Sequence, residues 1–196
     1  MKLILTRHGL TEENIAGIIQ GHLPGKLSKE GIEQAKKLAK RLKSERIDAI
    51  YSSDLARAAD TTKEIAKYHA HIIVNYVQDL REKFLGPWQG KSKEELGFGK
   101  ETSLTSVTCE VGESTEELFN RASQFLQTVL KKHSQETVLM VGHNGINRAL
   151  IAALTSKTHQ DLRTIEKLKN TSVCIFEIDE NKNYTIISFN CIKHLK

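Results

Sequence analysis

Short apolar runs alternate with longer amphipathic stretches along the chain. Three runs, 2–5, 48–51 and 137–141, are apolar after a single polar residue at the start. Such continuous runs are typical of strands buried on both faces of a sheet. Between the first two, the stretch 28–46 repeats apolar residues at helical spacing, and Ser28 is a candidate N-cap. Strands that alternate with helices are expected to pair in parallel.

The remaining patterned segments complete the expected elements. Three more amphipathic helices are predicted over 55–68, 115–133 and 146–154, and another strand over 72–77. Near the end, two apolar runs flank a polar turn and predict a β-hairpin, with its strands at 172–178 and 184–189. Alternating units place helices on both faces of a parallel sheet, and the hairpin must add an antiparallel strand. The sequence therefore predicts an α/β fold around a mostly parallel, mixed sheet.

Length and composition favour one ordinary globular domain over residues 1–196. Hydrophobic residues make up 39% and charged residues 27% of the 196 residues, which excludes collagen-like, low-complexity and wholly disordered classes. Neither a secretion signal nor a membrane-spanning run is visible, so a cytoplasmic protein is expected. Cys109, Cys174 and Cys191 match no metal-binding or disulfide pattern, which favours reduced thiols. The net charge of +5 is compatible with anionic partners.

Two histidines and two arginines follow predicted strands. His8 comes after the first strand and His143 after the run 137–141, each beside a glycine, with Arg7 preceding His8. Arg57 lies one turn into the helix that follows the second strand. Carboxyl ends of parallel strands meet at one rim of the sheet, where guanidinium and imidazole groups can hold a tetrahedral phosphate. A neutral imidazole there, of His8 or His143, could attack phosphorus.

Glu82 is the candidate proton donor for the leaving group. It follows the strand predicted at 72–77, and a carboxyl group crowded by phosphate tends to keep its proton. Each of these residues alone is more often structural or solvated, and their joint occurrence is what favours a site. The other histidines in polar or helix-end contexts are expected at the surface: His69, His71, His133, His159 and His194. Trp88 fits a pocket wall or local core equally well.

Five segments carry a family resemblance. They are LTRHGLTEEN at 5–14, SSDLARAADTT at 52–62, LREKFLGPWQG at 80–90, GES at 112–114 and VGHNG at 141–145. In this order they resemble the histidine phosphatase superfamily, specifically its phosphoglycerate-mutase-like branch. The resemblance covers nearly the whole chain and implies a three-layer α/β/α sandwich with one antiparallel strand. It implies no metal or organic cofactor.

The resemblance also implies roles for individual residues. His8 is expected to become phosphohistidine, with Arg7, Arg57 and His143 around the phosphoryl group and Glu82 as proton donor. Further contacts are implied for Asn14 as a phosphate ligand and, at the pocket edge, for Gln20, Gly21 and Asn144. The chain departs from the family pattern at the pocket rim, at Leu10, Glu13 and Gln89.

The expected reaction is hydrolysis of a small phosphomonoester. A mutase of the family is associated with longer chains and extra basic loops, whereas the expected lid at about 83–115 has no arginine between residues 91 and 115. A cofactor-dependent phosphoglycerate mutase and a non-catalytic anion-binding or protein-binding scaffold are the alternatives. No nucleic acid or membrane partner is expected, and the protein is expected to be a monomer or homodimer. The natural substrate is left open, with Phe84, Phe98 and Leu104 as candidate selectors.

Overall fold

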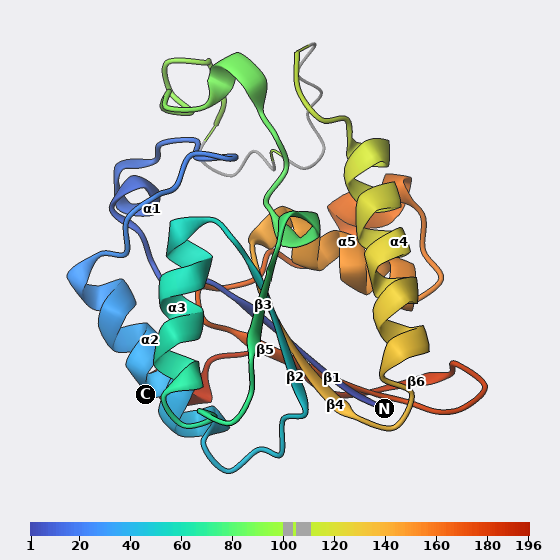
Figure 1. The fold of residues 1–196 in the computed structure, drawn as a ribbon. Coiled ribbons are helices and arrows are strands. Elements are labelled where there is room, and N and C mark those ends of the chain that lie inside the picture. Colours follow the sequence, from blue (N-terminus) through green and yellow to red (C-terminus); the bar gives the residue numbers. More distant parts are fainter. Residues whose placement is uncertain (100–103, 105–110) are drawn as a thin grey trace.

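A mixed six-stranded sheet forms the centre of the molecule (Figure 1). The structure, a computed structural model, describes residues 1–99, 104 and 111–196. The strand order is β3-β2-β4-β1-β5-β6, and the bounds are β1 (Lys2–Arg7), β2 (Ala49–Ser53), β3 (Val74–Val77), β4 (Thr137–Gly142), β5 (Val173–Ile178) and β6 (Tyr184–Cys191). β5 runs antiparallel to both of its neighbours, and the other pairs are parallel. The predicted mixed sheet with one antiparallel strand is confirmed.

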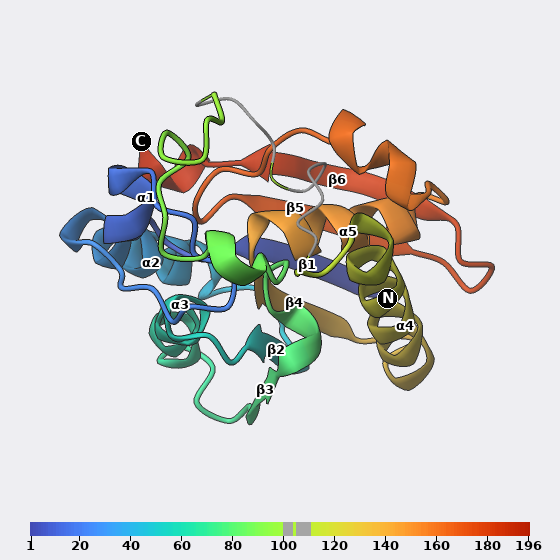
Figure 2. The same cartoon turned by 90° about the horizontal axis from the view of Figure 1, so that it is seen from above.

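Helices cover both faces of this sheet. α2 (Lys29–Leu42) and α3 (Ala56–Ala66) lie on one face, and α4 (Thr115–Lys132) and α5 (Asn144–Leu154) lie on the other (Figures 1 and 2). The three-layer sandwich is therefore confirmed, although α2 ends at Leu42 and so is shorter than predicted. In the described parts of the chain, no helix combines the length and hydrophobicity needed to cross a bilayer.

The central strands β1 and β4 each contain a continuous apolar run because they contact a helical layer on each side. Leu3 and Leu5 of β1 belong to the core under α4 and α5, whereas Ile4 between them belongs to the core under α2 and α3. All three side chains are fully buried. This double burial explains why β1 and β4 read as continuous apolar runs rather than as alternating patterns. It also makes the sheet a rigid support for the residues that follow its strands.

Local capping fixes where the helices begin. The hydroxyl of Ser28 accepts from the backbone N–H of Gly31, which confirms the predicted N-cap of α2. The short helix α1 (Glu12–Ala16) was not predicted, because five residues without a buried side chain give no helical periodicity. Thr11 and Asn14 nevertheless form a capping box at its start.

Two of the histidines expected at the surface are buried, so that prediction is wrong for them. His69 is 3% exposed and its Nε2 lies 3.1 Å from the carbonyl oxygen of Leu42. His133 is 7% exposed and its Nε2 lies 2.9 Å from the hydroxyl of Tyr51. Each ring satisfies a polar group inside the fold, and polar sequence neighbours cannot reveal such long-range partners.

Candidate active site

The carboxyl ends of the parallel strands open into a cavity of about 1110 Å³. Arg7 is the last residue of β1, His143 follows β4 and caps α5, and Arg57 lies in the first turn of α3 after β2. Glu82 follows β3 after a short 3-10 helix. Eight of the nine predicted site residues line the cavity: Arg7, His8, Asn14, Gln20, Gly21, Arg57, Glu82 and Asn144. The topology therefore brings together residues that are far apart in the sequence.

His8 lines the cavity with one ring nitrogen already occupied. Its Nδ1 is 2.8 Å from the carbonyl oxygen of Gly9, and the residue is 2% exposed. Burial, and then the charges of Arg57 and Arg7, hold the pKa of His8 well below its ordinary value of 6.5. The ring is therefore neutral near pH 7. Because a carbonyl oxygen can only accept, the proton is on Nδ1 and the lone pair is on Nε2.

His143 is the one predicted site residue that does not line the cavity. Its ring lies 5.0 Å from that of His8, centroid to centroid, and is fully buried. Arg57 Nε donates to its Nδ1 at 3.1 Å, so the neutral ring carries its proton on Nε2, which lies 2.9 Å from the hydroxyl oxygen of Ser53. Burial is the main cause that holds the pKa of His143 well below 6.5. This hydrogen bond fixes the orientation of Arg57 relative to His143.

The two arginines at the cavity use their donors differently. Arg57 donates from Nη1 and Nη2 to backbone carbonyls in the loop 21–24, in addition to its bond with His143. Arg7 donates from Nη1 to the carbonyl of Leu168 at 2.8 Å, while its buried Nε has no hydrogen-bond partner among the described residues. Burial lowers the pKa of both arginines to about 10, which leaves them charged at neutral pH. An unsatisfied, charged donor at this point favours an anion.

Glu82 faces the same cavity and is held by main-chain groups. Its Oε1 accepts from the N–H of Lys83 at 2.9 Å, and its Oε2 accepts from the N–H of Gly145 in the first turn of α5 at 3.1 Å. A helix N-terminus stabilises negative charge. The carboxyl group is thus fixed at the wall of the cavity by main-chain groups of two separate segments.

The rim residues are connected to one another and to the segment 166–171. Asn14 Oδ1 lies 3.4 Å from the backbone nitrogen of Thr11 and 3.4 Å from Asn170 Nδ2, which leaves its own amide nitrogen free to donate to a ligand. Asn144 Oδ1 accepts from the N–H of Leu168 at 3.0 Å. Gln20 donates to the hydroxyl of Thr11, and its buried Oε1 has no partner in the described structure.

The lid contributes only some of its expected residues. Phe98 and Leu104 line the cavity, and Trp88 packs edge-on against Phe98 at 5.2 Å instead of lining the cavity itself. Phe84 does not line it; its ring lies 5.2 Å from that of His22. Residues 100–103 and 105–110 of the expected lid lie outside the described residues, as does Cys109.

Several cationic residues at the cavity were not among the predicted site residues, although one of them, Lys93, belongs to the expected lid. They are Lys83, Lys93, Arg148, Arg163 and Lys167. Arg148 had a readable signal, because it lies four residues after Asn144 on a helix and therefore on the same face. The expected lid has no arginine between residues 91 and 115. Two arginines nevertheless line the cavity from other elements, Arg148 from α5 and Arg163 from the 3-10 helix His159–Thr164. Among the described residues, no cluster of three or more His, Cys, Asp or Glu could hold a metal ion.

Comparison with known proteins identifies the family. The model of the histidine phosphatase superfamily (branch 1) matches residues 3–191. The chain belongs to this superfamily. A metal-independent phosphoserine phosphatase of Arabidopsis thaliana is 37% identical over 99% of the chain and 83% of the relative. Phosphoserine phosphatase 1 of Hydrogenobacter thermophilus is 34% identical over 100% of the chain and 94% of that protein.

Solved structures agree with this assignment. YhfR of Bacillus stearothermophilus superposes with a TM-score of 0.88 at 28% identity, covering 100% of the chain and 99% of that protein. With the family established and with relatives named as phosphatases, this member of the superfamily is a phosphatase.

The depressed pKa of His8 predicts activity that persists in mild acid. A histidine nucleophile must be neutral, and His8 loses its neutral form only as the pH falls through its lowered pKa. We therefore expect no loss of kcat/KM attributable to the enzyme near pH 6.5. Measurement of kcat/KM against pH, corrected for the titration of the substrate phosphate near pH 6, checks this together with an NMR titration of the His8 ring. A His8 ring that titrates near 6.5 contradicts the prediction.

Proposed function

We propose that the enzyme hydrolyses phosphomonoesters through a phosphohistidine on His8, without a metal ion. The observation that carries this proposal is the state of the His8 ring. Its Nδ1 is held by the Gly9 carbonyl, and its pKa is lowered by burial and by Arg57 and Arg7. Nε2 is therefore the atom with a free lone pair, beside cations that attract the phosphate.

The reaction has two steps. In the first, His8 Nε2 attacks phosphorus, the ester P–O bond breaks, and the leaving oxygen takes a proton from Glu82. In the second, a water molecule attacks the phosphorus of phosphohistidine. Glu82 accepts the proton of that water, the P–N bond breaks, and inorganic phosphate is released. The hydrogen bond from the N–H of Gly145 holds Glu82 Oε2 in place for both steps.

The phosphoryl group is held mainly by Arg7 and Arg57. Arg7 has its Nε available, and Arg57 is fixed in place by His143 and by the loop carbonyls. The amide nitrogen of Asn14 adds a donor at the rim. These donors stabilise charge on the transferring oxygens in the transition state, which is the main source of catalysis expected in such a site.

Beyond the phosphate end, the cavity favours a substrate that carries further charges. Its wall combines the cations described above with three carboxylates, Glu13, Glu94 and Glu166. A phosphorylated amino acid carries a carboxylate that can pair with the cations of the wall. It also carries an ammonium group that can pair with the wall's carboxylates. The names of the two relatives support phosphoserine as the first substrate to test. Residues 1–196 act as one domain in this proposal, with the segment 83–115 as its lid.

The decisive experiment separates hydrolysis from the alternatives. The enzyme is mixed with a chromogenic phosphomonoester in excess EDTA, and rapid quenching measures the burst of alcohol release and the phosphoenzyme. A burst with phosphohistidine at His8, followed by release of phosphate, supports the proposal. Rapid exchange between 3- and 2-phosphoglycerate supports the mutase instead. Anion binding with no turnover of any phosphomonoester favours the non-catalytic scaffold.

A further inference from the structure

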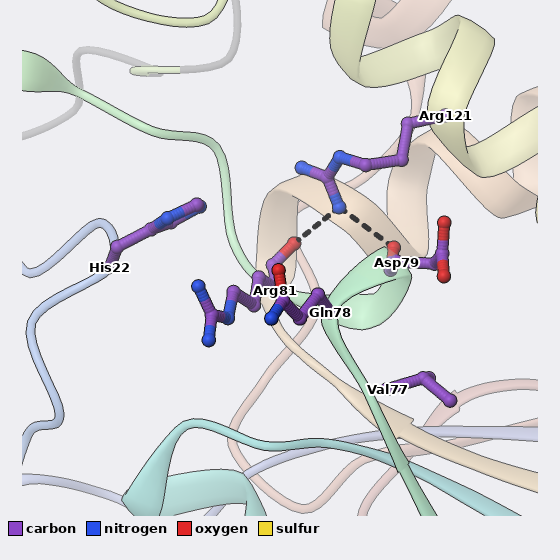
Figure 3. A pocket seen from close by; sticks show the side chains of 6 residues that line it. All are labelled: His22, Val77, Gln78, Asp79, Arg81 and Arg121. Carbon is purple, nitrogen blue, oxygen red and sulfur yellow. Dashed lines mark hydrogen bonds between the residues drawn. The ribbon is translucent and has the colours of Figure 1, made fainter.

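The segment that carries Glu82 separates two cavities. Glu82 lines the large cavity, whereas Gln78, Asp79 and Arg81 line a smaller one of about 570 Å³ together with His22, Val77 and Arg121. Figure 3 shows the guanidinium group of Arg121 pointing from α4 onto the backbone of this segment. The Glu82 carboxylate accepts from the N–H of Lys83 in this segment and from that of Gly145 in α5, so its position depends on where this backbone lies relative to α5.

Arg121 contacts three backbone carbonyls of the segment. Its Nη1 donates to the carbonyl of Asp79 at 2.7 Å and to that of Arg81 at 3.0 Å (Figure 3). Its Nη2 lies 3.4 Å from the carbonyl oxygen of Glu82. The Nε2 of His22 lies 2.8 Å from the same oxygen, so the main chain of Glu82 is held from two sides. One planar, charged group thus fixes the turn that presents the acid.

Glu113 fixes Arg121 in turn. Its two carboxylate oxygens accept from Arg121 Nε at 2.9 Å and from Nη2 at 2.8 Å, in a bidentate pair that is largely shielded from solvent. Glu113 also binds the backbone of Phe84 twice, through its N–H at 2.8 Å and through its carboxylate at 3.1 Å. Phe84 and Glu113 lie close to the two ends of the expected lid, so this pair joins the base of the lid to the acid segment.

We infer that Arg121, oriented by Glu113, is a positioning residue for the proton donor Glu82. This inference rests on the proposed function. Arg121 does not touch the reacting atoms; it sets the backbone from which the carboxyl group of Glu82 reaches the leaving oxygen. A misplaced acid slows the departure of poor leaving groups, which need a proton, more than that of good leaving groups, which do not. General loss of folded enzyme slows both equally.

The test compares a substrate whose leaving group needs a proton from Glu82 with one whose leaving group does not. We expect Arg121→Lys, which keeps the charge but loses the planar fork, to lower kcat/KM for an alkyl phosphate about 10-fold more than for p-nitrophenyl phosphate. Glu113→Gln is expected to show the same selectivity in weaker form. Glu82→Gln removes the acid itself and sets the maximum of this selectivity: we expect its kcat/KM to fall about 100-fold more for the alkyl phosphate than for p-nitrophenyl phosphate. Arg41→Lys is the matched control, because Arg41 is also a half-buried helical arginine that donates to a backbone carbonyl, that of Cys191.

The outcomes are distinguishable. Equal losses on both substrates in Arg121→Lys and Glu113→Gln, with selectivity in Glu82→Gln, overturn the positioning inference and leave the proposed function intact. Equal losses on both substrates in Glu82→Gln remove Glu82 as proton donor and overturn this inference with it. Thermal unfolding of each variant reports folding, and Glu113→Gln serves if Arg121→Lys does not fold. Selectivity in Arg41→Lys as large as in Arg121→Lys also overturns the inference.

Discussion

Replacing His8 with alanine is expected to lower kcat/KM for phosphomonoesters by at least about 10⁴-fold, the range seen when a covalent nucleophile is removed. The ring carries a free lone pair on Nε2 and lies within the influence of the charges of Arg57 and Arg7. Water bound in its place lacks both its nucleophilicity and its fixed position. The remaining activity comes from phosphate binding alone. Steady-state kinetics in EDTA and rapid-quench trapping of the phosphoenzyme measure the effect.

The control for this variant is another buried histidine. His69 is 3% exposed and lies after α3, away from the residues that line the cavity. We expect His69→Ala to lower thermal stability but to leave kcat/KM of the folded enzyme nearly unchanged. Equal activity of His8→Ala and wild type would rule out the phosphohistidine mechanism. A His8→Ala protein that still forms an acid-labile phosphoenzyme would assign the nucleophile to a different residue.

The fold was predictable because its strongest signals are local. Burial on both faces makes β1 and β4 continuous apolar runs, and α2 shows its inward face through regular spacing and a serine cap. The elements that were missed are short. α1 and the 3-10 helices are too brief for a periodic pattern, and they are held by capping and turn hydrogen bonds instead.

From residue patterns alone, the candidate site was predictable only where its residues follow strands; Asn14, Gln20 and Gly21 came from the family resemblance. Arg7, His8 and His143 sit at strand ends, so topology alone gathers them. Residues that act through long-range contacts gave no such signal. Ser53 reaches His143 and Leu168 reaches Arg7 across separations of 90 and 161 residues, in the latter case through a backbone carbonyl. No pattern of residue types encodes a contact that depends on main-chain atoms.

Replacing Arg7 with alanine is expected to lower kcat/KM by about 10²- to 10³-fold, the range for loss of one group that stabilises transition-state charge. Arg7 Nε is a buried, charged donor without a partner among the described residues, so a phosphate oxygen is its natural complement. We expect competitive inhibition by inorganic phosphate to weaken as well. Arg7→Lys keeps the positive charge but loses the planar guanidinium fork, so its kcat/KM should lie between that of the wild type and that of Arg7→Ala.

The comparison with Arg57 separates binding from folding. Arg57 also holds the loop 21–24, so Arg57→Ala is expected to lower the unfolding temperature more than Arg7→Ala does.

The charge of Arg7 lowers the pKa of His8. Its removal should therefore raise that pKa and move the acid limb of the pH profile of kcat/KM to higher pH. An unchanged acid limb with a reduced rate would mean that Arg7 supports the fold rather than the charge of the site. Conversely, a shifted limb with an unchanged unfolding temperature ties Arg7 to the same electrostatic environment that keeps His8 neutral.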